Sequence, residues 1–204
     1  MKTCDLEKIL PPRFEMERAF AQTFGDVPNR CLTQPGRIVA AILETPVGAM
    51  LAAASDDGIC FLDYTDGRML ERNLADIHRH FGRAIVPGKN QLLTKLRREL
   101  ANYFAGKKTP FTVPLVLAGT AFQEKTWDEL RRIPHGKTIS YAMLAQRIGQ
   151  PRAFRAVARA NAMNRICILI PCHRVIAADG TLSGYSGGVW RKQLLLQLEQ
   201  TGKV

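Results

Sequence analysis

The sequence lacks the features that would place it in a membrane or outside the cell. No run approaches the roughly 18 consecutive apolar residues that cross a bilayer, and the opening stretch MKTCDLEKILPPRFEMER has no apolar signal-peptide core. The five cysteines, at positions 4, 31, 60, 167 and 172, form an odd and irregularly spaced set. Such a set argues against the disulfide framework of a secreted domain. We therefore expect a cytoplasmic protein without membrane contact.

The sequence also lacks paired metal ligands, and it has too few acidic residues to balance its basic ones. The chain has no CxxC, and His78 and His80 are the nearest candidate ligands at short spacing, so we expect no metal site. Lys and Arg number 29 against 18 Asp and Glu, which leaves a formal charge of +11. This excess favours a polyanionic partner, but composition alone does not separate nucleic acid, an acidic membrane surface and simple solubility.

The apolar pattern divides the chain into parts. Its 204 residues, 46% of them apolar, suffice for one large domain or two small ones. Residues 1–30 are charged and carry three prolines, and they form an N-terminal extension with room for one helix at about 14–24. Between residues 37 and 65, the stretches RIVAAILET, GAMLAAAS and ICFLDYT alternate with the turn signals PVG and DDG, which predicts an antiparallel sheet.

Helical patterns dominate the remainder. Residues 68–80 and 91–104 read as amphipathic helices packed on that sheet. The segment GKKTPFTVPLVLAG, with two prolines among β-formers, suits a connecting strand or linker, and we place a boundary near residue 110. The prediction is an α+β protein with an N-terminal α/β lobe at 31–110 and a C-terminal domain at 111–204.

The C-terminal domain has the outline of a helix-turn-helix. A helix at 122–133 is followed by a second, which Ser140 caps and Gly149 ends, and Pro151 suits the first turn of a third that reaches about 163.

Three arginines give the third predicted helix a basic face. Arg152, Arg155 and Arg159 lie three and four residues apart and so share one side. That side could follow phosphates or be an ordinary solvated face, and spacing alone favours the two equally. The surplus positive charge favours DNA.

A reactive thiol is indicated after the apolar run 166–170. Cys172 stands beside His173 and Arg174, so its pKa can be lowered and it can react as thiolate. The alternative is a buried inert cysteine, because free Cys is among the most buried residue types. Adjacency alone adds little, since neighbours in a strand point to opposite sides.

The stretches ILIPCHRV and GYSGG, together with ISYAMLAQRIGQPRAFRAVARANAMN and RKQLLLQLE, resemble the O6-alkylguanine-DNA alkyltransferases, also called methylated-DNA–protein-cysteine methyltransferases. The resemblance is strong over about 120–200 and weaker over 35–118, mainly in TPVGAMLAAASDDGIC. It implies an N-terminal lobe with a small antiparallel, ribonuclease H-like sheet. It also implies a mostly helical C-terminal lobe that holds the helix-turn-helix and the active site.

Five residues receive catalytic roles from this resemblance. Cys172 is implied as the alkyl acceptor, His173 takes its proton through a bound water, and Glu199 orients the imidazole. Asn164 is implied to brace the turn before the recognition helix and to join the network near the cysteine. Tyr141 is implied to contact DNA and to protonate guanine N3 as the alkyl group leaves.

Other residues are implied in DNA binding and in the base pocket. Arg155 corresponds to the family's finger residue, an arginine whose side chain is inserted into the base stack in place of the extruded target nucleotide. The recognition helix lies in the minor groove, so binding should be nearly independent of sequence. The family's pocket corresponds to Val175, Tyr185, Ser186, Gly187 and Cys167.

This sequence also departs from the family pattern, and some residues have plainer readings. Cys167 stands where many relatives have proline, Trp190 follows the glycine pair, and Phe154 beside the finger is larger than the residue often found there. Taken singly, several functional candidates have plain alternatives: Glu199 as a surface charge, Tyr141 as an ordinary helix residue, Asn164 as a helix C-cap and Ser186 as a turn former. Their joint order and spacing favour the functional interpretation.

The implied activity is DNA repair by direct reversal. An alkyl group, methyl best, would pass irreversibly and stoichiometrically from O6-alkylguanine, and from O4-alkylthymine, in duplex DNA to Cys172 of a monomer without metal or organic cofactor. One rival is an alkyltransferase-like sensor that binds the lesion without chemistry. Another is a Cys-His hydrolase, which would need an oxyanion hole and repeated turnover.

The N-terminal extension carries a separate resemblance. Arg18-Ala19-Phe20 and the stretch FGDVP at 24–28 are similar to the end of an AraC-type helix-turn-helix. In the bacterial adaptive-response regulator such a domain precedes the alkyltransferase domain. We interpret the stretch as a remnant of a fused regulator that is too short to bind DNA alone.

Overall fold

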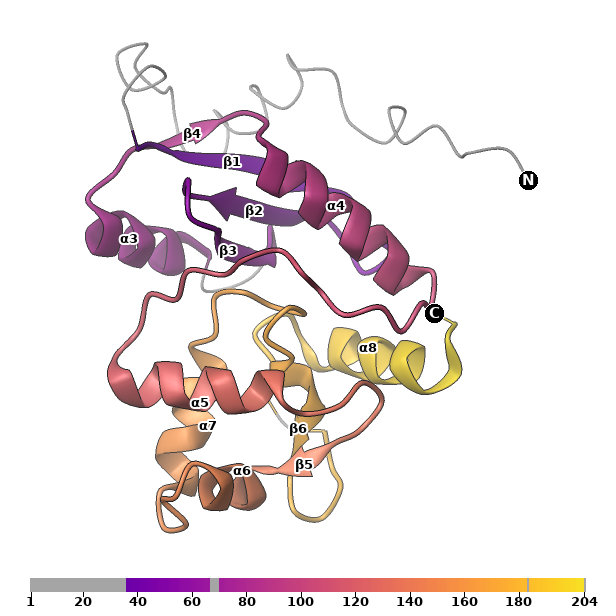
Figure 1. The fold of residues 1–204 in the computed structure, drawn as a ribbon. Coiled ribbons are helices and arrows are strands. Elements are labelled where there is room, and N and C mark those ends of the chain that lie inside the picture. The colour runs from indigo at the N-terminus through magenta and orange to yellow at the C-terminus, as the bar shows by residue number, and fades with distance from the viewer. Residues whose placement is uncertain (1–35, 67–69, 183, 204) are drawn as a thin grey trace.

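The computed structural model describes residues 36–66, 70–182 and 184–203. The predicted N-terminal helix and the AraC-like stretch lie outside these residues. Figure 1 shows a sheet-containing N-terminal lobe above a mostly helical C-terminal lobe, as the sequence predicts for an α+β protein. Among the described residues, no helix is both long and apolar enough to cross a membrane. The division near residue 110 stays a prediction.

The N-terminal sheet has four strands in the order β3-β2-β1-β4. Strands β1 (Ile38–Leu43), β2 (Met50–Ala54) and β3 (Ile59–Tyr64) form the predicted antiparallel meander. Strand β4 (Ile85–Pro87) pairs in parallel with β1 and adds a fourth strand to this meander. Helix α3 (Leu70–Phe81) carries the chain back across the sheet to this three-residue strand, which is too short to show alternation in the sequence.

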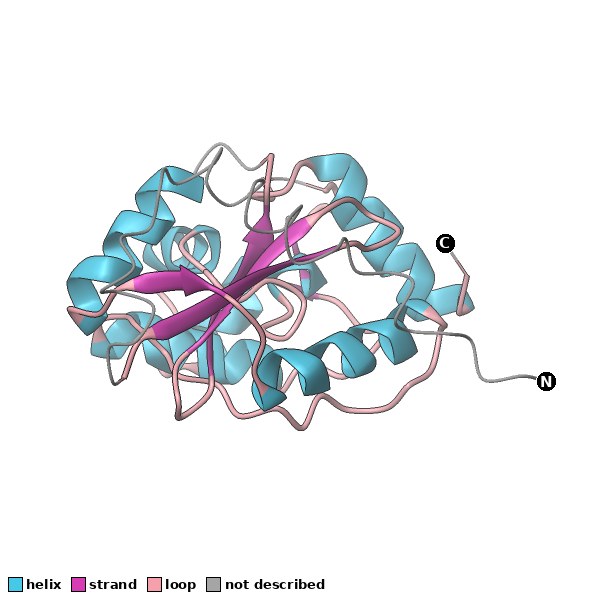
Figure 2. Ribbon diagram, turned by 90° about the horizontal axis from the view of Figure 1, so that it is seen from above, coloured by secondary structure: helices cyan, strands magenta, loops and turns pink. Residues whose placement is uncertain are grey.

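Two helices cover opposite faces of the sheet (Figure 2). Helix α3 packs Leu70, Leu74 and Ile77 against one face. Helix α4 (Gln91–Phe104) buries Leu93, Leu96, Leu100 and Tyr103 against the other face, and Asn90 caps it by accepting a hydrogen bond from Leu93 N. Both predicted amphipathic helices are therefore confirmed.

The outer edge of β3 joins the two lobes. The linker touches it through an isolated bridge between Ile59 and Leu115. Farther along, Leu62 N donates to Arg165 O at 2.8 Å, and Cys167 N donates to Leu62 O at 2.7 Å. A strand edge that would otherwise leave its backbone groups open is thus covered by the segment just before Cys172.

The C-terminal lobe contains helices α5 (Ala121–Arg131), α6 (Tyr141–Arg147), α7 (Phe154–Ala162) and α8 (Val189–Thr201). Thr120 and Gln123 form a capping box at α5, and the Ser140 side chain accepts from Met143 N at the start of α6. Strands β5 (Ile139–Ser140) and β6 (Val175–Ile176) form a parallel pair that the sequence does not predict, because each has two residues.

The third helix begins later than predicted. Pro151 and Arg152 lie in a turn that is closed by Ala153 N donating to Gln150 O at 2.9 Å, and α7 starts at Phe154. Proline's fixed φ suits the second position of such a turn as well as the first turn of a helix, so the sequence signal is ambiguous. Consequently Arg152 precedes the helix rather than belonging to it.

Candidate active site around Cys172

A tightly braced loop between α7 and β6 presents the candidate nucleophile. The Asn164 side chain accepts from Ile166 N at 2.9 Å and donates to Ile170 O at 2.8 Å and to Cys172 Sγ at 3.0 Å. Within this loop Ile168 has φ of +71°, an unusual conformation for a β-branched residue that reverses the chain. Asn164 joins the cysteine network as predicted, but it follows α7 and braces the turn after this helix, not before it.

Cys172 is buried, with 3% of its surface exposed. It begins a 3-10 turn, η2 (Cys172–Arg174), so the alternation of neighbouring side chains in a strand does not apply to Cys172 and His173. Cys167 is the largest influence lowering the pKa of Cys172, and Asn164 and the Lys192 ammonium lower it further, against the opposing effects of burial and of the Asp63 charge. The surroundings of Cys172 therefore ease the loss of its proton compared with an ordinary cysteine.

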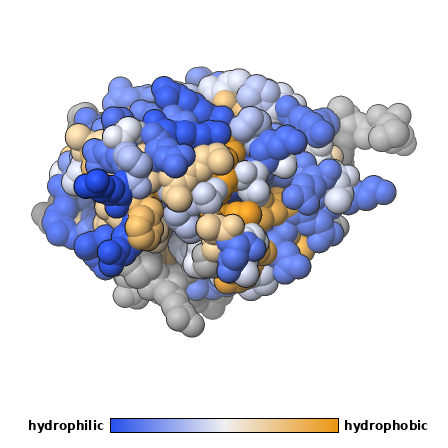
Figure 3. Space-filling view, turned by 90° about the horizontal axis from the view of Figure 1, so that it is seen from below, coloured by the Kyte–Doolittle hydropathy of each residue, from blue (hydrophilic) through white to orange (hydrophobic). Residues whose placement is uncertain are grey.

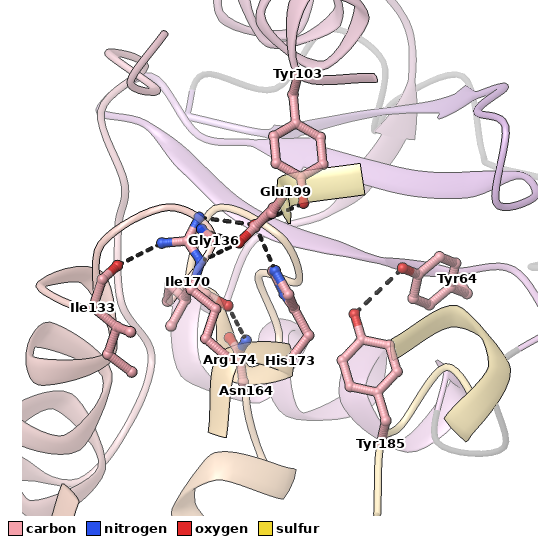
Figure 4. A network of polar contacts seen from close by, with 10 residues as sticks. All are labelled: Tyr64, Tyr103, Ile133, Gly136, Asn164, Ile170, His173, Arg174, Tyr185 and Glu199. Carbon is pink, nitrogen blue, oxygen red and sulfur yellow. Dashed lines mark hydrogen bonds and ion pairs between the residues drawn. The ribbon is translucent and has the colours of Figure 1, made fainter. Parts of the chain in front are cut away.

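His173 and Glu199 form a buried pair (Figure 4). His173 Nε2 lies 2.8 Å from Glu199 Oε1. Glu199 also accepts from Tyr103 Oη, from Gly136 N and twice from Arg174, at 2.8–3.0 Å. Burial alone would raise the pKa of Glu199, but the hydrogen bonds and charges of His173 and Arg174 lower it. An ionised carboxylate only accepts, so Nε2 carries the ring proton of neutral His173.

The other ring nitrogen of His173 is in a different position. Nδ1 has no hydrogen-bond partner among the described residues, although it is buried. Burial lowers the pKa of His173, so the ring is neutral at pH 7 and Nδ1 is an acceptor. This is the arrangement of an imidazole held by a carboxylate on one side and free to take a proton on the other.

The Cys167 thiol lies between Cys172 and the opposite lobe. Besides its contact with Cys172, its sulfur is 3.4 Å from Asp63 Oδ1 and 3.8 Å from Ser186 Oγ. Asp63 also accepts from Asn73, and burial raises its pKa. Cys167 thus lies beside Cys172, and its predicted place in the base pocket stays a prediction.

A cavity of about 620 Å³ opens beside these residues. Its lining includes Tyr141, Arg159, Met163, Tyr185 and Ser186, so the structure brings together four of the predicted DNA and pocket residues. The cavity falls within the 300–1,000 Å³ that is typical of small-ligand pockets.

The loop after the cavity packs on the N-terminal lobe. Tyr185 Oη lies 3.3 Å from Tyr64 Oη, and a Cβ on Gly187 would lie 2.4 Å from the Tyr64 ring. Only glycine lets the loop pass this close to the ring. The contacts with Tyr64 fix Tyr185 and Ser186 at the cavity. Val175, another predicted pocket residue, is buried, and its carbonyl accepts a hydrogen bond from Lys192 Nζ at 2.7 Å.

Comparisons with known proteins agree with this geometry. Residues 38–117 match the family model described as 6-O-methylguanine DNA methyltransferase, ribonuclease-like domain, and residues 121–201 match the DNA binding domain of the same family. A Methanosarcina barkeri protein named methylated-DNA–protein-cysteine methyltransferase is 40% identical over 159 residues, which are 78% of this chain and 95% of the relative. The chain belongs to the 6-O-methylguanine DNA methyltransferase family.

Further members extend the comparison. The crystal structure of Mycobacterium tuberculosis OGT in complex with DNA superposes with a TM-score of 0.70 at 36% identity, covering 82% of this chain and 94% of that one. The Escherichia coli bifunctional transcriptional activator/DNA repair enzyme Ada is 42% identical over 161 residues, and this chain covers 44% of its length.

The arginines of this methyltransferase-family chain are distributed differently from the prediction. Arg155 and Arg159 are exposed on α7, whereas Arg152 is exposed in the preceding turn. The predicted basic face of α7 therefore contains only Arg155 and Arg159, and Arg152 precedes the helix. The opposite side of α7 buries Val157 and Ala160.

The sequence alone does not identify several residues of the site. Arg174 was expected to act on the thiol, but it donates to Glu199 and, through Nη1, to Ile133 O at 2.6 Å. Tyr103 and Asp63 come from the other lobe, and no local pattern marks them. The closing-helix stretch RKQLLLQLE contains Lys192, but its complete burial follows only from tertiary packing. Among the described residues, no cluster of three or more His, Cys, Asp or Glu could hold a metal ion.

Proposed function

We propose that this protein repairs alkylated DNA directly, by moving an alkyl group from O6 of guanine, or O4 of thymine, to Cys172. The observation that carries the proposal is the Cys172 thiol, held 3.0 Å from the Asn164 amide and followed by the buried His173–Glu199 pair. Family membership and relatives named methylated-DNA–protein-cysteine methyltransferase support it.

Access to the lesion requires extrusion of the damaged nucleotide. O6 lies inside the base stack, and the sulfur must approach the alkyl carbon in line with the breaking C–O bond. Unstacking costs a few kcal/mol, and less for a base that is already mispaired. The cavity beside Tyr141, Tyr185 and Ser186 would hold the extruded base, and Arg155 on the exposed side of α7 would fill its place in the stack.

The transfer step is a single displacement. Cys172 gives its proton through a water to His173 Nδ1, the sulfur forms a bond to the alkyl carbon, and the C–O6 bond breaks with its electron pair passing to the purine. Tyr141 supplies a proton to N3, so guanine leaves as a neutral base. The step leaves His173 as an imidazolium and Tyr141 as a phenolate, so it conserves charge, and release of one proton to water and uptake of one from water restore both residues. Glu199 stabilises the imidazolium that forms meanwhile.

The product fixes the stoichiometry and the mode of binding. Thiol exchange acts on disulfides and leaves a thioether intact, so each molecule repairs one lesion. We propose a monomer acting in the cytoplasm, with α7 in the minor groove of duplex DNA. Readout there is degenerate, so the protein can find damage in almost any sequence.

The test is mass spectrometry after incubation with duplex DNA containing O6-methylguanine. One added methyl group is expected on the peptide containing Cys172, and none on the peptide containing Cys60, a buried thiol whose pKa is raised to about 12 by burial. The Cys172→Ser variant should bind the duplex but leave the lesion intact.

Other outcomes would identify the rivals. Binding without modification of the wild-type protein would indicate a lesion sensor. Release of many product molecules per chain would indicate a hydrolase. Consumption of the lesion with Cys172 unmodified would overturn the proposed mechanism.

A further inference from the structure

An exposed aromatic side chain stands at the first residue of the recognition helix. Phe154 is 47% exposed, which makes it one of the large apolar side chains that the described residues leave in water. Single exposed apolar residues are common, and exposure alone would require no explanation. Its neighbours, however, are the exposed arginines of α7. A side of a helix that only faced water would be expected to carry polar residues throughout.

The spacing along α7 connects Phe154 to the cavity. Residues four apart lie one above the other on a helix, so Phe154 stands one turn before Ala158. Ala158 lines the cavity together with Arg159 and Tyr141. The phenyl ring therefore extends the cavity-lining side of α7 beyond the cavity itself, toward the end of the helix that carries Arg155.

Phe154 also contacts the predicted finger. The Arg155 guanidinium carbon lies 5.7 Å from the centre of the Phe154 ring, within the range of a cation–π contact. Figure 3, which views the molecule from the α6–α7 side, shows apolar surface in the middle of this face with hydrophilic surface around it. An apolar centre with a polar surround is what a binding face presents to a partner.

We propose that Phe154 is a second wedge, which enters the minor groove beside Arg155 and packs its ring on the base step next to the extruded nucleotide. The proposal rests on the proposed function. Minor-groove proteins often insert Phe, Leu, Ile or Met between base steps, which unstacks them and bends the duplex. Here the guanidinium fills the vacated position, and the ring covers the exposed face of the neighbouring base pair.

The experiment compares Phe154→Ala and Phe154→Leu in two reactions. Equilibrium binding to an O6-methylguanine duplex is measured in the Cys172→Ser background, where no transfer intervenes. Phe154→Ala should bind about 5- to 150-fold more weakly, as expected for loss of one base–aromatic contact, and Phe154→Leu should lie between it and the parent. With Cys172 intact, the rate of reaction with free O6-benzylguanine should stay unchanged, because no duplex is involved.

Salt dependence separates the wedge from the finger. Phe154→Ala removes no charge, so the slope of log affinity against log salt should equal that of the parent, whereas Arg155→Ala should reduce the slope by about one. Affinity of Phe154→Ala within twofold of the parent would overturn the proposal. So would loss of the free-base reaction together with a lowered melting temperature, since that would mean a structural role.

The wedge and the proposed function fail in different ways. Absence of methyl on wild-type Cys172 would refute the transfer activity itself. Normal methylation of the wild type, combined with parental duplex affinity in both Phe154 variants, would refute the wedge alone.

Discussion

Replacing Glu199 by glutamine should destabilise the fold and impair the acceptor site together. The carboxylate accepts five hydrogen bonds from four residues, Tyr103, Gly136, His173 and Arg174. A glutamine amide offers one acceptor oxygen and an NH₂ group, so donors on one side would face another donor. In addition, Arg174, which is only 9% exposed, would lose its counter-charge.

The expected magnitude follows from that unpaired charge. Removing one partner of a buried ion pair typically costs about 3–5 kcal/mol, which is a large part of the roughly 5–15 kcal/mol that stabilises an ordinary domain. Urea unfolding monitored by tryptophan fluorescence would measure the loss. Tyr103→Phe is the matched control, because it removes one donor to the same carboxylate and keeps the charge, so it should cost less, about 1.5–3 kcal/mol.

Acid dependence provides a second readout of the same network. The folded-state pKa of Glu199 lies below its ordinary value of 4.5, so its contribution to stability is complete above that pH and is lost as the pH falls through the folded pKa. Glu199→Gln should lack this acid-sensitive component. A variant within about 1 kcal/mol of wild type at pH 7, with an unchanged acid profile, would refute the claim that the buried pair sustains this site.

Two further substitutions test the thiol and the lobe contact. Cys167→Ala removes the largest influence lowering the pKa of Cys172, so the pH profile of alkyl transfer should shift to higher pH and the rate at pH 7 should fall. Cys60→Ala is the control and should leave the profile unshifted. A Cys167→Ala profile equal to that of the control would contradict the prediction. Arg191→Met should cost about 2–4 kcal/mol in thermal unfolding, because the Val47 and Gly187 carbonyls both lose a buried donor, and a melting temperature equal to wild type would show that water replaces the arginine.

Local signals explain which parts of the fold could be predicted. Ser140 and Gly149 bound α6 through interactions within a few residues, and helix α4 occupies the predicted residues because its apolar side chains repeat at helical spacing. Strands β4, β5 and β6 have two or three residues, so no periodicity can develop in them. The start of α7 was misplaced because Pro151 fits a turn and a helical first turn equally well.

The chemistry of the site depends on longer separations. The roles of Cys172, His173 and Glu199 could be predicted from the family resemblance. Arg174 was predicted to act on the Cys172 thiol, and this prediction is wrong. Its guanidinium reaches Glu199, which lies 25 positions away, and adjacency to Cys172 does not reveal that direction. Asp63 is 104 positions from Cys167, and no pattern near either residue connects them.

The edge of β3 explains how the lobes share one active site. Leu62 exchanges two backbone hydrogen bonds with the Arg165–Cys167 stretch, so the strand fixes the position of the loop that carries Cys172. One residue farther along β3, Asp63 accepts a hydrogen bond from the Cys167 thiol, and Cys167 is the largest influence lowering the pKa of Cys172. The N-terminal lobe therefore acts on the acceptor twice, once through the backbone and once through a buried thiol. A C-terminal lobe separated from β3 would keep every predicted catalytic residue, yet it would lose the contacts that place and activate the sulfur.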